Sequence, residues 1–259
     1  MTHSFRNILI AAAAIAGLTS AAHAQTIPAN VHNVVLVHGA FADGSGWRGV
    51  YDRLTAKGYK VSVVQNPLTS LADDVAATRR VLARQDGPTI LVGHSYGGTV
   101  ITEAGNDPKV AGLVYVAALA PDTGESTGDQ FAKIPAPPGF VIETQSDGFG
   151  FVNLAKFKSG FAGDVSDADA AFMRDSQVPI AMSAFGDKIT KAAWRVKPSW
   201  FVVATQDGAI DPKLLRQTAA RIGAQTVEIK GSHVVFLSQP EAVANVIDKA
   251  AKASGQKTN

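Results

Sequence analysis

Hydrophobic residues along this chain gather into short, nearly unbroken runs that alternate with longer stretches at helical spacing. Short runs rich in valine and leucine, bounded by glycine, proline or polar residues, are typical of strands buried in a parallel sheet. The runs predict strands at residues 33–37, 60–65, 89–93, 110–118, 199–204 and 226–230. The stretches between them predict helices at 47–57, 70–85, 212–222 and 240–252, with a further helix beginning near residue 96. This alternation predicts an α/β protein in which helices flank a mostly parallel sheet of about six strands.

One segment, residues 121–195, interrupts this rhythm. It carries three closely spaced prolines, has poor strand character and contains eight of the 12 phenylalanines. An insertion of this length between two core strands is usually functional, so we expect a mostly helical cap with helices at 167–176 and 180–191. Most of its phenylalanines should hold the cap onto the core, while others line a substrate pocket. We assign Phe185 of the cap and Phe41 of the core to substrate binding.

The N-terminus has the three regions of an export signal. A short positively charged region precedes an apolar stretch over residues 8–18, and Ala22-His23-Ala24 matches the cleavage pattern. Residues 1–24 are therefore expected to be a signal peptide, which makes the mature protein periplasmic or secreted. The apolar stretch is too short to cross a bilayer as a stable helix, so we expect no stable membrane span in the mature chain.

Composition narrows the classes of function. With 259 residues, 46% of them hydrophobic, the chain can bury one sizeable core, formed by residues 25–120 and 196–259. Its 24 basic and 22 acidic residues leave a formal charge of +2 without a basic run, so no nucleic acid is expected as a partner. The absence of cysteine excludes disulfides and a lipoprotein start. Nothing in the sequence indicates an oligomeric state.

The most specific motif is Gly93-His94-Ser95-Tyr96-Gly97, which joins a predicted strand to a predicted helix. In this context Gly-x-Ser-x-Gly is typical of a sharp turn that exposes a serine hydroxyl at the edge of the sheet. The φ angle of such a turn is unfavourable for a residue with a side chain, and its neighbours must be small, as Gly93 and Gly97 are. We therefore predict Ser95 as the catalytic nucleophile.

A serine hydroxyl needs a base, and on this scaffold the chain order is Ser, then Asp or Glu, then His. His233 follows the last predicted strand, at the carboxyl edge of the sheet where active sites of α/β proteins are built. His94 is enclosed in the turn and His38 precedes a glycine in a loop, so we expect structural roles for both. Since no ligand spacing accompanies these histidines, no metal is expected. We predict His233 as the base.

Three aspartates follow predicted strands and compete to orient this base. Asp207 comes directly after the strand at 199–204. Asp211 precedes Pro212 and is expected to cap a helix, which is a structural role. Asp122 follows the preceding strand and is the weaker third candidate. We predict Asp207 as the catalytic acid, with Asp211 as the next candidate.

The negative charge that develops on the attacked oxygen needs two backbone N–H donors that are in place before the reaction. One donor is the residue after the nucleophile, Tyr96. The other is expected from the loop after the first strand, where Gly39 allows close approach of the backbone. We choose the N–H of Ala40, with Phe41 as the alternative. This chemistry requires no cofactor.

Together these motifs resemble, in type and order, those of the α/β-hydrolase fold superfamily. They are Val35-Leu36-Val37-His38-Gly39-Ala40-Phe41, Gly93-His94-Ser95-Tyr96-Gly97-Gly98, Asp207 and Gly231-Ser232-His233. The resemblance covers essentially the whole mature chain. It is greatest to bacterial esterase-like members of the branch that contains plant methyl-ester esterases and hydroxynitrile lyases. It implies the α/β-hydrolase fold, without the extra N-terminal strands of many members, and a cap inserted before the strand that bears the acid.

The resemblance also sorts the reactions. Epoxide hydrolases and haloalkane dehalogenases of this fold use an aspartate where this chain has Ser95. Hydroxynitrile lyases of the branch carry a lysine after the catalytic histidine, where this chain has Val234. We therefore expect a serine hydrolase that cleaves carboxylic esters or lactones of small, apolar or aromatic compounds through an acyl-enzyme. A lyase of the hydroxynitrile type that uses the same serine and histidine, and a non-catalytic binder of small ligands, are the alternatives.

Overall fold

A six-stranded parallel sheet forms the centre of the computed structural model, which describes Met1 and residues 31–255. The strand order is β2-β1-β3-β4-β8-β9, and every neighbouring pair is parallel. The strands are β1 (Asn33–Val37), β2 (Lys60–Val64), β3 (Thr89–His94), β4 (Val110–Val116), β8 (Ser199–Ala204) and β9 (Gln225–Ile229). The expected sheet is therefore confirmed, with β1, β3 and β8 buried along their whole length.

Helices cover both faces of this sheet. They are α1 (Arg48–Ala56), α2 (Leu71–Ala83), α3 (Gly97–Ala104), α7 (Pro212–Arg221), α8 (Val235–Ser238) and α9 (Pro240–Gly255), with a 3-10 turn η1 (Gly44–Trp47) before α1. The connection from β1 to β2 and the connection from β2 to β3 run in opposite directions along the sheet. Right-handed connections of this kind place α1 and α2 on opposite faces. Accordingly α1 packs against α9, and α2 packs against α3.

Local sequence signals explain where two of these helices begin. The Ser70 side chain accepts a hydrogen bond from Asp73 N and caps α2. The Asp211 side chain accepts from Lys213 N and caps α7, whose first residue is Pro212. Both caps agree with the expectation from the sequence.

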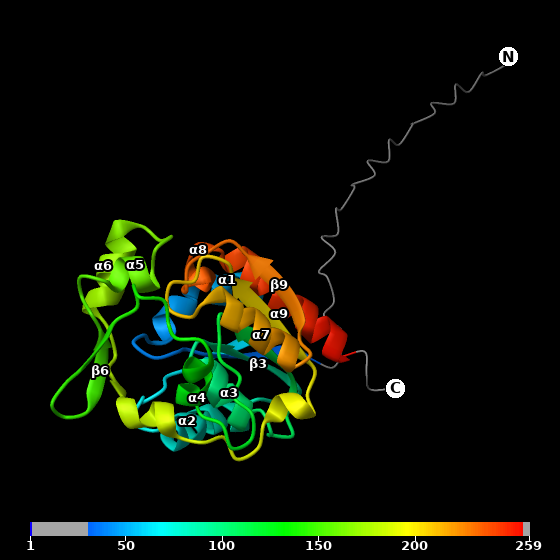
Figure 1. Cartoon of the computed structure of the whole chain (residues 1–259). Coiled ribbons are helices and arrows are strands. Elements are labelled where there is room, and N and C mark those ends of the chain that lie inside the picture. The colour runs from blue at the N-terminus through cyan, green and yellow to red at the C-terminus, as the bar shows by residue number, and fades with distance from the viewer. Residues whose placement is uncertain (2–30, 256–259) are drawn as a thin grey trace.

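The segment between β4 and β8 contains both helices and strands. Its elements are α4 (Thr127–Lys133), β5 (Ile142–Thr144), β6 (Phe149–Val152), α5 (Phe157–Phe161), α6 (Asp167–Asp175), β7 (Ile180–Ala181) and two 3-10 turns, η2 (Met182–Gly186) and η3 (Ala193–Arg195). The strands form an antiparallel sheet in the order β5-β6-β7. In Figure 1, α5, α6 and β6 project together from one side of the core. The predicted helix at 167–176 corresponds to α6.

The predicted helix at 180–191 is wrong. Ile180 pairs with Gly150 of β6, so the segment begins as a strand. The 3-10 turn that follows ends at Gly186, and the next residues are extended and held by contacts with the core. The Asp187 carboxylate accepts from Leu71 N at 2.9 Å, and Thr190 N donates to a Glu103 carboxylate oxygen at 2.8 Å. These tertiary contacts outweigh the helical spacing of the apolar residues.

The signal peptide expected at residues 1–24 lies, apart from Met1, outside the described residues. Within the described part of the chain, no helix is both long enough and apolar enough to cross a membrane.

Candidate active site

Ser95 occupies the sharp turn between β3 and α3. Its φ is +54°, in the left-handed region that residues with side chains rarely adopt. The turn is so tight that a Cβ on Gly93 would lie 2.5 Å from Gly97 O, and a Cβ on Gly97 would lie 2.6 Å from His38 O. The glycines on either side are therefore required by the backbone, and the strained serine is a feature typical of functional sites.

His233 and Asp207 form a buried pair at the carboxyl ends of β8 and β9. His233 Nδ1 lies 2.8 Å from Asp207 Oδ2, and the two side chains are 1% and 0% exposed. Asp207 Oδ1 accepts from the backbone N–H groups of Ala209 and Ile210, each at 2.8 Å. Because a carboxylate can only accept, the proton of the neutral imidazole lies on Nδ1, and Nε2 carries the free lone pair. This is the tautomer that a general base requires.

Ser95 and His233 line the same cavity. Among the hydrogen bonds of the described residues, none joins Ser95 to His233, and the imidazole keeps only the bond to Asp207. Hydrogen bonds between a nucleophile and its base are often long without substrate and shorten in the reacting complex. The structure therefore brings the three residues predicted for catalysis to one place, with the histidine already oriented.

The two other candidate histidines have structural roles, His38 through both ring nitrogens and His94 through one of them. His38 Nδ1 donates to Gly39 O at 2.8 Å, and its Nε2 accepts from Asn66 N at 2.9 Å. His94 Nε2 donates to the backbone carbonyl of His233 at 3.0 Å, and its ring packs against Phe236. Burial lowers the pKa of His38 and holds the pKa of His94 well below its ordinary value, so both are neutral. His94 thus holds the backbone of the proposed base.

The other two aspartates considered for the acid role lie elsewhere. Asp211 caps α7, as described above. Asp122 forms an ion pair with Arg195, and both of its oxygens are engaged by that guanidinium.

The two predicted oxyanion donors flank the serine. Ala40 and Tyr96 both line the cavity that contains Ser95. A Cβ on Gly39 would lie 2.8 Å from Ser95 Cβ, so the loop backbone passes directly beside the nucleophile. Within the described residues, neither the Ala40 N–H nor the Tyr96 N–H has a hydrogen-bond acceptor. Phe41, the alternative donor, has a φ of +62°, which turns the chain sharply after Ala40.

The cavity is small and lined mainly by apolar side chains. Its volume is about 20 Å³, which holds about one water molecule. Phe41 and Phe185, the residues predicted to bind substrate, both line it, and their rings lie 6.4 Å apart. Four of the eight phenylalanines of the segment 121–195 reach it, namely Phe131, Phe140, Phe161 and Phe185. Since an ester is much larger than one water, the cap or its side chains must move before a substrate can reach Ser95.

A second apolar hollow of about 130 Å³ adjoins the first. Phe172 and Met173 of α6 line it on the cap side, and Phe236 and Leu237 line it on the core side. Phe41 lines both hollows, so the two meet at this residue.

Asp164 of the cap contacts the loop that carries His233, and the sequence analysis missed this contact. Its carboxylate accepts from Ser232 N at 2.9 Å, from Ser238 Oγ at 2.6 Å and from Ser232 Oγ. Burial acts to raise the pKa of Asp164, but these hydrogen bonds outweigh burial and hold the pKa below its ordinary value. Through Asp164, the cap therefore binds Ser232, the residue that precedes His233. The sequence carries no signal for this contact, because 68 residues separate Asp164 from Ser232.

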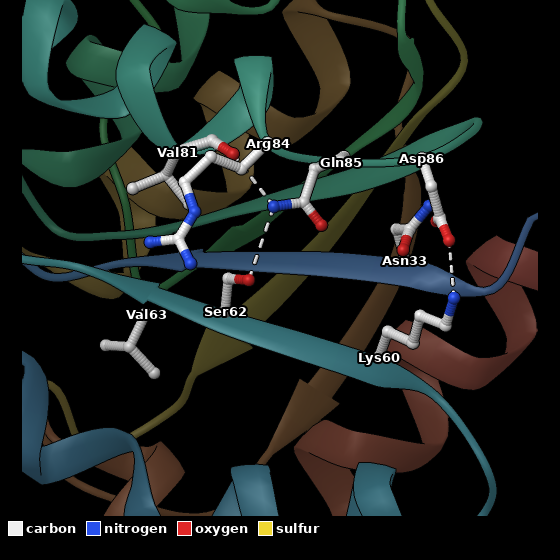
Figure 2. A pocket seen from close by; sticks show the side chains of 8 residues that line it. All are labelled: Asn33, Lys60, Ser62, Val63, Val81, Arg84, Gln85 and Asp86. Atoms are coloured by element: carbon white, nitrogen blue, oxygen red, sulfur yellow. Dashed lines mark hydrogen bonds and ion pairs between the residues drawn. The ribbon is translucent and has the colours of Figure 1, made fainter.

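A larger hollow of about 440 Å³ lies at the opposite end of the sheet (Figure 2). Asn33 and Lys60, the first residues of β1 and β2, line it together with Asp86, which pairs with Lys60. Gln85 and Ser62 are hydrogen-bonded to each other on its wall. It holds no nucleophile beside a base, so the chemistry belongs to the carboxyl edge of the sheet.

Comparison with known proteins shows which family and which solved structures this chain is similar to. Residues 34–246 match the model of the alpha/beta hydrolase family. The pyrethroid hydrolase of Sphingobium wenxiniae is 29% identical, over 87% of this chain and 90% of that protein. The crystal structure of a pyrethroid hydrolase from Sphingobium faniae has a TM-score of 0.73 at 22% identity, over 86% of this chain and 98% of that one. Polyneuridine aldehyde esterase has a TM-score of 0.71 at 20% identity, over 85% of this chain and 99% of that one. These two structures show that the fold is shared.

Proposed function

The chain belongs to the alpha/beta hydrolase family, and we propose that it is a serine hydrolase that cleaves carboxylic esters or lactones of small, apolar or aromatic compounds. The observation that carries this proposal is the buried pair of His233 and Asp207, oriented for proton transfer and facing the same cavity as Ser95. The names of the relatives, a pyrethroid hydrolase and an esterase, support ester cleavage as the reaction.

The first half of the reaction forms an acyl-enzyme. Ser95 Oγ attacks the carbonyl carbon of the ester while His233 Nε2 takes the hydroxyl proton. The imidazolium that forms is stabilised by the Asp207 carboxylate. The oxygen of the tetrahedral intermediate accepts hydrogen bonds from the N–H groups of Ala40 and Tyr96. The intermediate then collapses, the alcohol leaves with the proton from His233, and the acyl group remains on Ser95.

The second half returns the free enzyme. His233 takes a proton from a water molecule, which attacks the acyl carbon of the ester to Ser95. The same N–H pair binds the oxygen of the second intermediate. Collapse releases the carboxylic acid, and His233 returns the proton to Ser95 Oγ.

The side chains that line the cavity support the proposed class of substrate. Around Ser95 the side chains from the cap are aromatic or aliphatic, apart from Thr127, and none of the described residues lines the cavity with a lysine, arginine, aspartate or glutamate side chain. A carboxylate or ammonium on the substrate would have to be desolvated there without a partner, at a cost that an apolar group does not carry. The hollow beside Phe41 is mostly apolar as well, although Asp43 and Asp169 also border it.

We further propose that the mature protein is periplasmic or secreted, because residues 1–24 have the three regions of a signal peptide. Fractionation of producing cells followed by N-terminal sequencing tests this point. Export with cleavage gives Gln25 as the first residue, whereas an intact Met1 on active protein would contradict it.

Turnover of p-nitrophenyl esters from acetate to decanoate, compared with the Ser95→Ala variant, tests the function. The proposal predicts hydrolysis that requires Ser95, and the chain-length optimum measures the space that the cap provides. Cyanide release from cyanohydrins without ester turnover would instead indicate a lyase.

A further inference from the structure

Asp74 is a buried carboxylate that the proposed reaction does not use. It lies in α2 and is fully shielded from solvent. Among the described residues it has no ion pair with lysine, arginine or histidine, and the charges of two acids, Asp73 and Asp187, act to raise its pKa. A buried carboxylate without a cation is costly, so its position calls for an explanation.

One oxygen of Asp74 holds the residue that follows the nucleophile. Tyr96 Oη donates to Asp74 Oδ2 at 2.9 Å. Burial raises the pKa of Tyr96, so the phenol stays protonated and can only serve as the donor to this carboxylate. The ring of Tyr96 meets Phe185 of the cap edge-to-face at 5.7 Å. The side chain of Tyr96 is thus fixed at its tip by α2 and along its ring by the cap.

The other oxygen of Asp74 holds the loop between β2 and α2, to which a strand of the cap is hydrogen-bonded. Leu68 N donates to Asp74 Oδ1 at 2.8 Å. Leu68 has a φ of +59°, a strained conformation for a branched side chain, and its carbonyl accepts from Ala181 N of β7 at 2.9 Å. The carboxylate therefore stabilises a strained backbone that carries a cap strand.

Resting on the proposed function, we propose that Asp74 is a positioning residue that holds the oxyanion-binding amide of Tyr96 in place and ties it to the cap through Leu68. Both anchors require acceptor oxygens, and only the ionised carboxylate offers two acceptors without a proton between them. The tyrosine tip, its ring and its backbone N–H then form one rigid unit beside Ser95, so the amide is oriented before charge develops.

The arrangement predicts that the ionisation of Asp74 appears in the pH dependence of kcat. Burial, with smaller contributions from Asp73 and Asp187, raises the pKa of Asp74 to about 6, and the hydrogen bonds from Leu68 and Tyr96 offset this only in part. Below that pH the carboxyl group is protonated. A proton on Oδ1 would face the N–H of Leu68, and a proton on Oδ2 would reverse the hydrogen bond with Tyr96 Oη, so one of the two anchors changes. The amide of Tyr96 is then held less firmly, and turnover falls in addition to any loss from protonation of His233.

The experiment compares Asp74→Asn with Asp73→Asn, which removes a neighbouring charge from the same turn of α2 without touching Tyr96. Tyr96→Phe keeps the ring and the backbone amide and removes only the hydroxyl. For each full-length variant, kcat and KM for p-nitrophenyl acetate are measured from pH 5 to 8. The released product is followed at a wavelength where p-nitrophenol and p-nitrophenolate absorb equally. Circular dichroism verifies that each variant is folded.

We expect kcat to fall about tenfold in Asp74→Asn and in Tyr96→Phe, with KM within threefold of the wild type, because an oxyanion contact acts in the transition state. The double variant should lose little more than either single one, because the two side chains act as a pair. The ionisation near pH 6 should be present in the wild type and in Asp73→Asn and absent in Asp74→Asn.

Equal kcat and equal pH profiles for Asp74→Asn and Asp73→Asn would overturn the proposal. A fall of kcat in both of these variants that parallels a loss of folded protein in circular dichroism would overturn it too. Ser95→Ala separates this failure from that of the proposed function. If Ser95→Ala is inactive while Asp74→Asn is normal, only the role of Asp74 is wrong. If Ser95→Ala keeps the wild-type rate, the serine mechanism itself is wrong.

Discussion

His233 Nδ1 lies 2.8 Å from Asp207 Oδ2, and the other oxygen of that carboxylate is fixed by two backbone N–H groups. The imidazole therefore cannot change its tautomer without losing its only acceptor on that side. His94 Nε2 also donates a hydrogen bond to the backbone carbonyl of His233, so this residue is fixed both at its ring and at its main chain. The histidine that shares a cavity with Ser95 is therefore held rigidly.

Asp207→Asn should lower kcat by about 10⁴-fold with little change in folding. An asparagine amide that donates to Nδ1 would place the imidazole proton on Nε2, where it blocks uptake of the proton from Ser95. Steady-state turnover of an ester substrate measures the effect. Asp211→Asn is the matched control, because asparagine also caps helices well and Asp211 touches neither His233 nor Ser95. A similar loss in both variants would contradict the role given to Asp207.

Asp164→Ala should lower kcat by about tenfold by loosening the loop that carries His233. Asp164 supplies the acceptors for Ser232 N and for two serine hydroxyls, and Asp164→Asn, which keeps one acceptor oxygen, should restore part of the rate. The control is Asp167→Ala, an exposed aspartate on the same part of the cap that pairs only with Lys158. Unchanged kcat in Asp164→Ala would show that the cap does not position the base.

Stability should depend on pH through Asp74. Its pKa is raised from 3.8 to about 6 in the folded protein, so the folded state binds the proton more tightly than the unfolded state. The stability from that proton is fully present below about pH 4 and is lost as pH rises through about 6, and the difference amounts to about 3 kcal/mol.

Asp74→Asn removes this titration. Relative to the wild type, its Tm should therefore rise by several degrees between pH 4 and pH 8. Thermal unfolding followed by circular dichroism at constant ionic strength measures it. A Tm difference that stays constant over this range would show that Asp74 does not titrate there.

Phe185→Ala should shift the preference among p-nitrophenyl esters toward longer acyl chains. Phe185 lines the small cavity at Ser95 and packs against the rings of Phe41 and Tyr96, so its removal opens space where the substrate must fit. Because Phe185 is only half-buried, the loss of stability should lie at or below the lower end of the about 3–5 kcal/mol typical of buried phenylalanines. The ratio of kcat/KM for octanoate to acetate is the readout. Leu154→Ala, at a side chain of the same segment that is 60% exposed and lines neither hollow, should leave that ratio unchanged.

Much of the fold followed from short-range patterns in the sequence. The valine-rich runs predicted all six core strands. The strands β1, β3 and β8 are buried along their whole length, as expected where both faces are covered, whereas the edge strands β2 and β9 are partly exposed and contain polar residues. Ser70 and Asp211 marked helix starts through their own hydrogen bonds to the backbone. The turn at Ser95 was predictable for the same reason, since only glycine at positions 93 and 97 permits it.

The cap was less predictable because long-range contacts decide its structure. Residues 180–191 have helical spacing, yet the segment begins as a strand paired with Gly150 and, after a 3-10 turn, is anchored on Leu71 and Glu103. The two carboxylates that the sequence analysis missed, Asp74 and Asp164, act on residues 22 and 68 positions away. No local pattern reports such pairs, so they become visible only when the chain is folded.

The most direct test is covalent labelling of the purified protein with a fluorophosphonate, with the modified residue identified by mass spectrometry of a proteolytic digest. A serine mechanism predicts one label, on Ser95. In Ser95→Ala the label should be lost and ester turnover should fall by at least about 10³-fold. The same mechanism also predicts that label formation slows in Asp207→Asn, because the nucleophile then lacks its base. Near-normal turnover by Ser95→Ala, or a label on another residue that abolishes activity while Ser95 stays unmodified, would contradict it.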